Sequence, residues 1–214
     1  SFISLGTSGV MLVVKKQYLP NPQSAVHTFC HAIPNRWIQM GVILSATDSL
    51  NWLSNNLEVD VAELSRSLGN KIKGPNRTLF LPYLSGERTP HNDSKIRGAF
   101  LNIDIATSRN DLTQAIMEGV SFALRDNLEV LNSTGTTLKR ALVIGGGSQS
   151  FFWLELLATV LNLPLDIPEK SEFGAAFGAA RLAMAGVSDV SLNTIMTKPK
   201  IEKTIYPSPG LIEC

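Results

Sequence analysis

Two glycine-rich segments carry the residues best suited to holding a phosphorylated ligand. They are Gly6–Gly9 (GTSG) and Gly145–Ser148 (GGGS). Glycines let a ligand approach the backbone closely, and tight turns and helix N-termini offer N–H groups to phosphate oxygens. Neither segment has the G-x-G-x-x-G or G-x-x-x-x-G-K-[ST] pattern, so neither dinucleotide nor P-loop chemistry is indicated. Each segment, taken alone, could also be only a turn.

A second group of polar residues could do acid–base chemistry. Glu87, Arg88, His91 and Asp93 form the densest polar cluster of the sequence. A carboxylate, a histidine and an arginine can move protons, but charge-assisted hydrogen bonds can equally tie down a loop. Asp48 lies on a mostly apolar predicted helix without an identifiable partner, so we do not assign it as a general base.

The histidines and cysteines indicate no metal site. His27, His31, His91, Cys30 and Cys214 do not have the spacing of metal ligands. Nothing in the sequence supports a disulfide between the two cysteines, which favours a reducing, cytoplasmic compartment.

Composition narrows the class of partner. The chain has 214 residues, 44% hydrophobic content and a formal net charge of +1. This is enough for one large domain or two small ones. The near-neutral charge gives no electrostatic reason to expect nucleic acid or an anionic membrane surface. No run of about 20 apolar residues occurs, so we expect no membrane span.

The predicted elements place both glycine segments beside strands. Phe2–Leu5 and Val10–Val14 are apolar, β-rich runs that flank Gly6–Gly9 as a hairpin. Arg140–Ile144 is a predicted strand before Gly145–Ser148, and Phe151–Leu161 is a predicted helix after it. This rhythm is typical of an α/β fold with helices packed on a sheet. Because a buried strand begins at Phe2, we expect the chain to be a piece of a longer protein.

The remaining predicted elements are less directly tied to the glycine segments. They are an extended region over His27–Met40, a helix over Gly41–Asn55, a short helix capped by Asp60, an apolar run over Thr78–Leu84, the longest helix over Arg109–Leu131, a short strand over Leu165–Ile167, a helix over Phe173–Ala185 and a peripheral segment over Lys198–Cys214. The small residues of Gly174–Ala180 favour a helix that packs closely on a sheet or on another helix, with no ligand role.

The two glycine segments are most informative together. A phosphate hairpin combined with a strand–glycine–helix element is how the actin-like ATPase architecture holds ATP. Further ordered motifs follow the same family pattern, namely Leu81–Asp93, Arg97–Phe100, Asp111-Leu112 with Glu118-Gly119, and Trp153 after the second glycine segment. On these motifs nearly the whole chain resembles the C-terminal half of the FGGY carbohydrate kinases. Gly86–Asp93 is most similar to the xylulose kinases of that family.

The resemblance implies the fold and the site. The fold would be a single ribonuclease-H-like (actin-like ATPase) α/β lobe over residues 1–214, a mixed sheet with helices packed on it. Gly6 and Thr7 would face the β- and γ-phosphates of the nucleotide, and Trp52 would line the site unless it is a core residue. The full set of matching nucleotide-contacting positions is Gly6, Thr7, Thr47, Asn51, Trp52, Gly146, Gly147 and Phe151.

Two departures from the family pattern matter. Asn102 stands where the second family signature has glycine. The catalytic aspartate of the family belongs to a Gly-Gly-Asp-Asn-like segment that precedes the hairpin, and no such segment occurs in this sequence. Residues that bind the sugar also belong largely to the N-terminal domain of the family.

The resemblance therefore implies an ATP- or ADP-binding lobe that works with Mg2+ and is catalytically inactive alone. Its partners would be its own N-terminal domain and a pentulose sugar held by that domain. The sequence does not determine the oligomeric state, and exposed apolar surface could support a homodimer. The alternatives are another sugar specificity in the same family (gluconate, ribulose or glycerol) and a free-standing, non-catalytic nucleotide-binding module.

Overall fold

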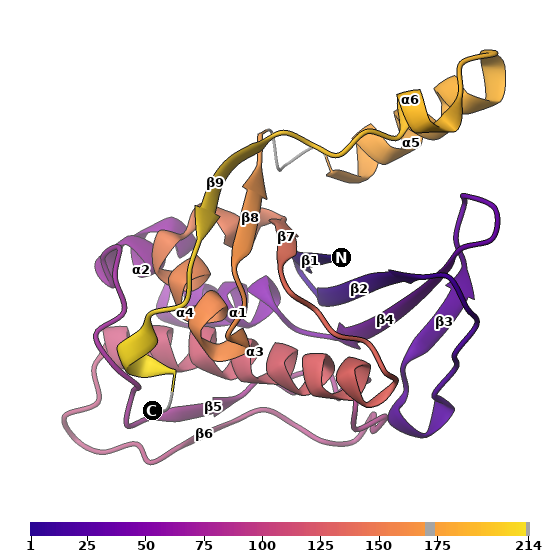
Figure 1. Ribbon diagram of the computed structural model, residues 1–214. Coiled ribbons are helices and arrows are strands. Elements are labelled where there is room, and N and C mark those ends of the chain that lie inside the picture. The colour runs from indigo at the N-terminus through magenta and orange to yellow at the C-terminus, as the bar shows by residue number, and fades with distance from the viewer. Residues whose placement is uncertain (170–173, 213–214) are drawn as a thin grey trace.

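A mixed β-sheet forms the centre of the protein in a computed structural model that describes residues 1–169 and 174–212 (Figure 1). Within these residues the sheet has seven strands in the order β3-β4-β2-β1-β7-β8-β9. Neighbouring strands run antiparallel except for the pairs β1–β7 and β7–β8, which are parallel. The strands are β1 (Phe2–Leu5), β2 (Gly9–Lys15), β3 (His27–Cys30), β4 (Trp37–Ile43), β7 (Ala141–Ile144), β8 (Leu165–Pro168) and β9 (Ile201–Ile205).

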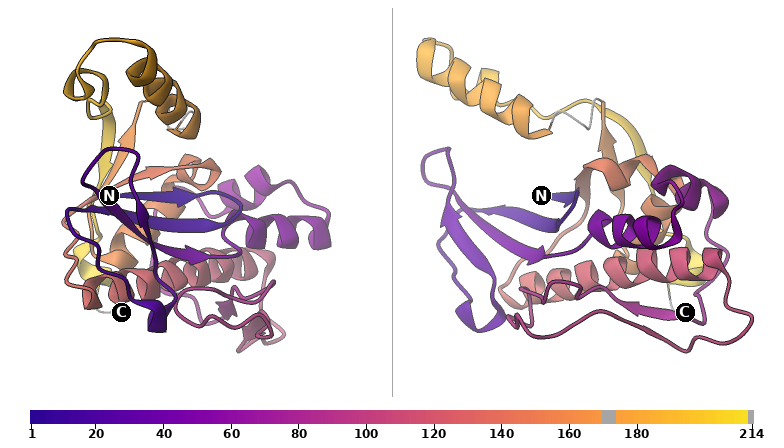
Figure 2. Two further views of the ribbon diagram at one scale, coloured as in Figure 1. Left: turned by 90° about the vertical axis from the view of Figure 1, so that its right-hand side faces the viewer. Right: turned by 180° about the vertical axis from the view of Figure 1, so that it is seen from behind.

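Helices cover one face of this sheet and bury the core against it (Figures 1 and 2). They are α1 (Thr47–Leu57), α2 (Val61–Ser67), α3 (Arg109–Ser133) and α4 (Phe151–Leu161). Ile3, Leu5 and Ile43 of the sheet are fully buried, as are Trp153 and Leu157 of α4 apart from a trace of exposure. Alternate residues of β1 and β2 face this core because side chains of a strand point to opposite faces.

Helix α3 is buried on two sides because a second layer covers it. A two-stranded sheet of β5 (Leu79–Leu81) and β6 (Ala99–Leu101) packs on the side of α3 that faces away from the large sheet. Gly119 permits this close approach, since a Cβ there would collide with the carbonyl oxygen of Phe80. Ser108 and Asp111 form a capping box that starts α3.

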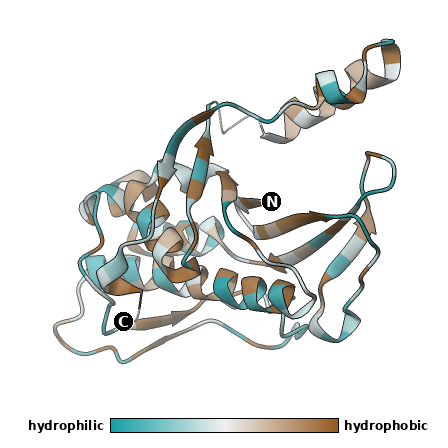
Figure 3. Cartoon of the chain, in the orientation of Figure 1, coloured by the Kyte–Doolittle hydropathy of each residue, from teal (hydrophilic) through white to brown (hydrophobic). Residues whose placement is uncertain are grey.

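The other face of the large sheet is open and apolar. Its outward residues, including Phe2, Leu12 and Ile144, line a cavity of about 960 Å3 together with Gly174 and Phe177 of α5 (Gly174–Val187). Figure 3 shows hydrophobic colour on the strands beside the N-terminus. Helix α5 projects away from the body and continues through α6 (Leu192–Ile195).

Four expectations need correction or completion. The helix predicted over Gly41–Asn55 starts too early, because Val42 and Ile43 belong to β4 and α1 begins at Thr47. The close packing predicted for the small residues of α5 is wrong, since no described residue of α5 is buried. The peripheral segment at the end of the chain contains a strand that sequence reasoning missed, β9. Phe173, Cys214 and the residues between 169 and 174 lie outside the described residues.

Candidate functional site

The parallel pairing of β1 with β7 brings the two glycine segments together. Phe2 is paired with Leu142, Ile3 with Val143 and Ser4 with Ile144, so both strands end at the same edge of the sheet. We call Gly6–Gly9 the hairpin turn and Gly145–Ser148 the glycine turn. Each follows directly after its strand, and the two turns are therefore neighbours although they are far apart in the sequence. Carboxyl ends of adjacent parallel strands are common places for ligand sites.

The two turns touch so closely that only glycine fits at two positions. A Cβ at Gly145 would lie 2.6 Å from the carbonyl oxygen of Leu5 and 3.1 Å from the nitrogen of Gly6. A Cβ at Gly147 would lie 2.5 Å from Cγ of Leu5. Gly145 also has a φ of +98°, which residues with a side chain rarely adopt. The backbone of the glycine turn thus packs directly against Leu5, the residue that precedes the hairpin turn.

Gly146 differs from its two neighbours because it faces open space. It is exposed, and a Cβ there would meet no heavy atom within 4 Å. The short 3-10 helix η2 (Gly146–Gln149) follows, and Ser148 fixes it by donating from its backbone N–H (3.0 Å) and its hydroxyl (2.6 Å) to the carbonyl of Gly145. A ligand can therefore reach the backbone at Gly146 without displacing protein atoms.

The N-terminus of α1 is hydrogen-bonded to the hairpin turn. The backbone N–H groups of Ala46 and Asp48 donate to the carbonyl of Thr7, at 2.8 Å and 3.3 Å, and the N–H of Thr47 donates to the carbonyl of Gly6 at 2.9 Å. These bonds satisfy N–H groups that a helix start leaves unpaired. They also place the positive end of the α1 dipole directly behind the hairpin turn. The side chain of Thr7 itself is exposed.

Of the predicted α1 residues, Thr47 lies at the hairpin turn and Asn51 lies one helical turn further on the same face. The ring of Trp52 stacks on the ring of Phe80 and lies tilted against the ring of Phe100, each with a centroid distance of 6.3 Å. Trp52 packs on the β5–β6 layer but stays 39% exposed, so it is not a core residue, and its contact with nucleotide stays a prediction.

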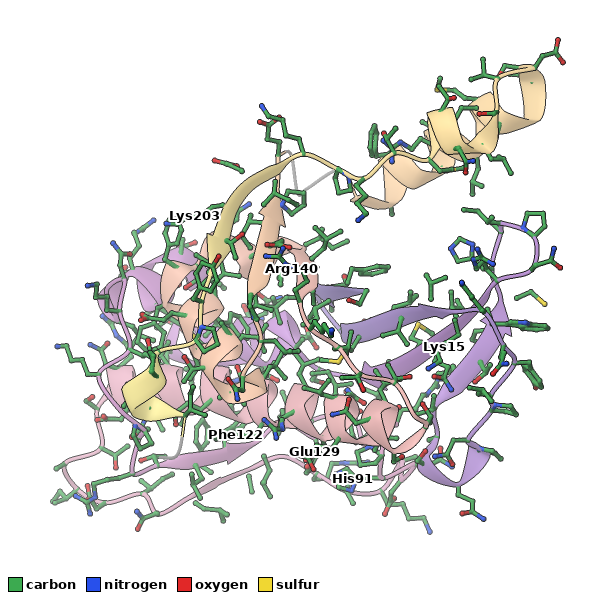
Figure 4. The ribbon with its side chains drawn as sticks, viewed as in Figure 1. Lys15, His91, Phe122, Glu129, Arg140 and Lys203 are labelled. Carbon is green, nitrogen blue, oxygen red and sulfur yellow. The ribbon has the colours of Figure 1, made fainter. Side chains whose placement is uncertain are left out.

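Phe151 lies at the far side of the glycine turn. Ser150 caps α4 by accepting from the backbone N–H of Trp153 (3.3 Å), and it also accepts from the hydroxyl of Ser65 on α2 (2.9 Å). Phe151 is 46% exposed. Nζ of Lys203 on β9, the residue labelled in Figure 4, lies 4.1 Å from the centroid of the Phe151 ring. Sequence reasoning missed Lys203, because nothing in the sequence indicated that this late segment returns to the glycine turn.

The structure thus brings Gly6, Thr7, Thr47, Gly146 and Gly147 together at one edge of the sheet. Within the described ranges 1–169 and 174–212, no group of three or more His, Cys, Asp or Glu side chains could hold a metal ion. In the same ranges, no helix is both long enough and apolar enough to cross a bilayer.

Comparison with known proteins identifies the protein family to which the chain belongs. The profile of the FGGY family of carbohydrate kinases, C-terminal domain, matches residues 1–187, and the chain belongs to this family. The fold is accordingly the ribonuclease-H-like lobe of the actin-like ATPase architecture, as predicted.

Particular relatives narrow the resemblance. The chain is 38% identical over 209 residues to the xylulose kinase of Escherichia coli (strain K12), covering 97% of this chain and 43% of that protein. It is 38% identical over 202 residues to the xylulose kinase of Klebsiella pneumoniae, covering 93% and 41%. The crystal structure of a xyloylose kinase from Brucella ovis superimposes with a TM-score of 0.95 at 50% identity, covering 99% of this chain and 44% of that one. The chain therefore spans less than half of the length of each of these relatives.

Proposed function

We propose that this chain is the nucleotide-binding lobe of an ATP-dependent sugar kinase of the xylulose kinase type. The observation that carries the proposal is the meeting of the hairpin turn and the glycine turn at the carboxyl ends of β1 and β7. In the whole enzyme the reaction would transfer the γ-phosphoryl group of ATP to xylulose and release xylulose 5-phosphate and ADP. The similarity to xylulose kinases over nearly the whole chain supports this sugar.

Each part of the site has a role in this proposal. The hairpin turn would contact the β- and γ-phosphates through its backbone and the exposed hydroxyl of Thr7. The α1 dipole behind it would favour the phosphate charge. Gly146 and Gly147 would let adenosine lie against the backbone, with Asn51 and Phe151 at the margins. Magnesium would arrive with ATP and offset charge on the transferring group.

The general base on the sugar hydroxyl is not assigned to any residue of this chain. By resemblance to the family, it would be an aspartate of the N-terminal domain, which would also hold the pentulose. We expect that domain to cover the open apolar face of the sheet, because that face would otherwise leave a large hydrophobic surface in water. Among the residues that the structure describes, which leave out Cys214, Cys30 is exposed and unpaired, which fits the cytoplasmic location that we propose.

Calorimetry with Mg-ADP tests the nucleotide site. Gly146→Leu should weaken binding at least about tenfold, because the new side chain occupies the open space at the glycine turn, a loss of about 1.4 kcal/mol. The matched control is Gly178→Leu on α5, where a Cβ also meets nothing within 4 Å. No heat with a folded sample at millimolar Mg-ADP, or equal affinities for the two variants, would count against the site.

The chain alone should not turn over ATP in response to xylulose. A coupled ADP-release assay with and without the sugar checks this. Sugar-dependent turnover by the purified 214-residue chain would show that the chain carries a general base of its own and would refute the proposed division of roles.

A further inference from the structure

The segment Gly86–Asp93 has no role in the site described so far, yet it is bound tightly to the end of β4. The backbone N–H of Thr89 donates to the carbonyl of Val42 (3.0 Å), and the N–H of Val42 donates to the hydroxyl of Thr89 (3.1 Å). Two residues further along the chain, the N–H of Leu44 donates to Oε1 of Glu87 (3.0 Å). The segment is therefore bonded to the end of β4 at Val42 and, through the Glu87 side chain, to the residue that follows the strand.

The segment is also closed on itself, which fixes Glu87 in place. Glu87 and Asp93 exchange backbone hydrogen bonds of 2.8 Å and 2.9 Å. Gly86 has a φ of +79°, and a Cβ there would lie 2.8 Å from Cα of Ser94. Oε1 of Glu87 also accepts from the backbone N–H of Arg88 at 2.7 Å. The Glu87 carboxylate is thus held rigidly against Leu44.

Leu44 is the first residue of the short connection that supports the hairpin turn. Ala46 and Thr47 follow within three residues and donate to the carbonyls of Thr7 and Gly6. The bond from Leu44 to Glu87 fixes the start of this connection, and the bonds from Ala46 and Thr47 fix its end. Because peptide units are planar and stiff, so short a connection has little freedom once both ends are bonded.

The burial of Glu87 indicates that its charge does more than stabilise the fold. Its side chain is only 3% exposed, and within the described residues its Oε2 is buried without a hydrogen-bond partner. A buried carboxylate that is only half satisfied destabilises a protein relative to a neutral group of the same shape. Such departures from the most stable choice concentrate at functional sites.

We propose that Glu87 is a positioning residue for the hairpin turn. Its carboxylate accepts the Leu44 N–H in a charge-assisted bond, which holds the α1 start against the carbonyls of Gly6 and Thr7. This inference rests on the proposed function only in the sense that the hairpin turn is the part that would contact phosphate. The positioning itself is a property of the protein without ligand.

Amide hydrogen exchange of the 214-residue chain, resolved by residue with NMR, tests the proposal. Glu87→Ala should raise the amide exchange rates of Ala46 and Thr47 about tenfold relative to that of Val143 in the core of β7. The reason is that local opening of this connection no longer has to break the hydrogen bond between Leu44 and Glu87. Glu87→Gln keeps an acceptor of the same shape but removes the charge, and it should give a smaller increase at the same two amides. It also serves where the alanine variant fails to fold.

Glu118 on α3 provides the matched control. It is 4% exposed, and it accepts from the backbone N–H of Asn76 (3.0 Å) and from Nε2 of Gln114 (2.8 Å). Its carboxylate therefore anchors a different connection and does not contact the α1 start. Glu118→Ala and Glu118→Gln should leave exchange at Ala46 and Thr47 unchanged relative to Val143.

The outcomes separate this inference from the proposed function. Equal exchange at Ala46 and Thr47 in the Glu87 and Glu118 variants would overturn the positioning role, whether or not ADP binds. If the parent chain binds Mg-ADP, Glu87→Ala should weaken binding about tenfold, and unchanged affinity with unchanged exchange would refute the inference while leaving the nucleotide site standing. If the parent chain does not bind Mg-ADP, the exchange comparison still decides whether Glu87 positions the hairpin turn.

Discussion

Gly147→Ala tests whether the two halves of the site depend on each other through one close contact. The new Cβ would lie 2.5 Å from Cγ and 2.6 Å from Cδ2 of Leu5, and 3.2 Å from its carbonyl oxygen. Leu5 is fully buried and directly precedes the hairpin turn, so it has no free space into which to move. The added methyl group must push either Leu5 or the glycine turn out of place.

The expected loss of stability follows from this overpacking. Extra methyl groups in a well-packed core destabilise by about 1–3 kcal/mol. For a domain of this size, each kcal/mol lowers Tm by about 2–4 °C. Gly146→Ala is the control one residue away, because its Cβ meets no atom within 4 Å. It should leave the free energy of unfolding within about 0.5 kcal/mol of the parent.

A double-mutant cycle identifies Leu5 as the residue that is displaced. Leu5→Ala alone should destabilise by about 2–5 kcal/mol because it leaves a cavity in the core. The methyl group that Gly147→Ala adds would partly fill that cavity, so the double variant should be more stable than the sum of the two changes predicts by about 0.5–3 kcal/mol. Urea unfolding followed by circular dichroism measures all four proteins.

Two results would refute the reasoning. If Gly147→Ala unfolds at the same urea concentration as Gly146→Ala, the close contact does not limit the site. If the two changes at positions 5 and 147 are additive, the clash is not with Leu5, and the turns are not coupled through that side chain.

Three further predictions concern other parts of the molecule. Burial raises the pKa of Glu87 above its ordinary value of 4.5, against the opposing effect of the hydrogen bonds from Arg88 and Leu44. The folded state therefore binds this proton more tightly, and the contribution of Glu87 to stability falls as pH rises above 4.5. Glu87→Gln should therefore be at least as stable as the parent at pH 7, with the difference shrinking toward pH 4.5 in urea titrations. If the ring of Trp52 only packs on the β5–β6 layer, Trp52→Leu should lower Tm without changing the affinity for Mg-ADP. A large loss of affinity would indicate that Trp52 contacts the nucleotide. Gly119→Ala should destabilise by about 1–3 kcal/mol through the clash with the backbone of Phe80, whereas Gly178→Ala should be neutral or stabilising by up to about 1 kcal/mol, and equal effects in thermal melts would argue against the close packing of α3.

The parts of the fold that depend on local patterns could be predicted from the sequence. The strands around the hairpin turn, the strand before the glycine turn and the bounds of α4 agree with the structure. These segments combine apolar runs with glycine or a capping residue, and such signals act over a few residues. The neighbourhood of the two turns could be predicted only through the family resemblance, since no local signal pairs β1 with β7.

The errors arose where distant contacts decide the structure. Val42 and Ile43 lie in β4 because the strand pairs with β2 and packs on α3, where a Cβ at Gly41 would lie 2.5 Å from Oδ1 of Asn127. Strand β9 is exposed over its first three residues and has no strong local strand signal, and its pairing with β8 makes it a strand. The small residues of α5 suggested close packing, but among the described glycines of that helix only Gly174 has a close contact, with Ile144 of β7.

The adjacency of β1 and β7 also has a kinetic consequence. The strands are neighbours in the sheet, yet most of the chain lies between them in the sequence. Bringing such distant segments together is slow, because the entropy of closing the loop is lost before the contacts form. During synthesis, β1 would wait beside β2 with one edge unpaired until β7 leaves the ribosome, which is the interval in which such an edge can pair wrongly. A nucleotide that bridges both turns would bind only after β1 and β7 have paired. At 100 times its Kd it would add about 2.7 kcal/mol to the free energy of unfolding.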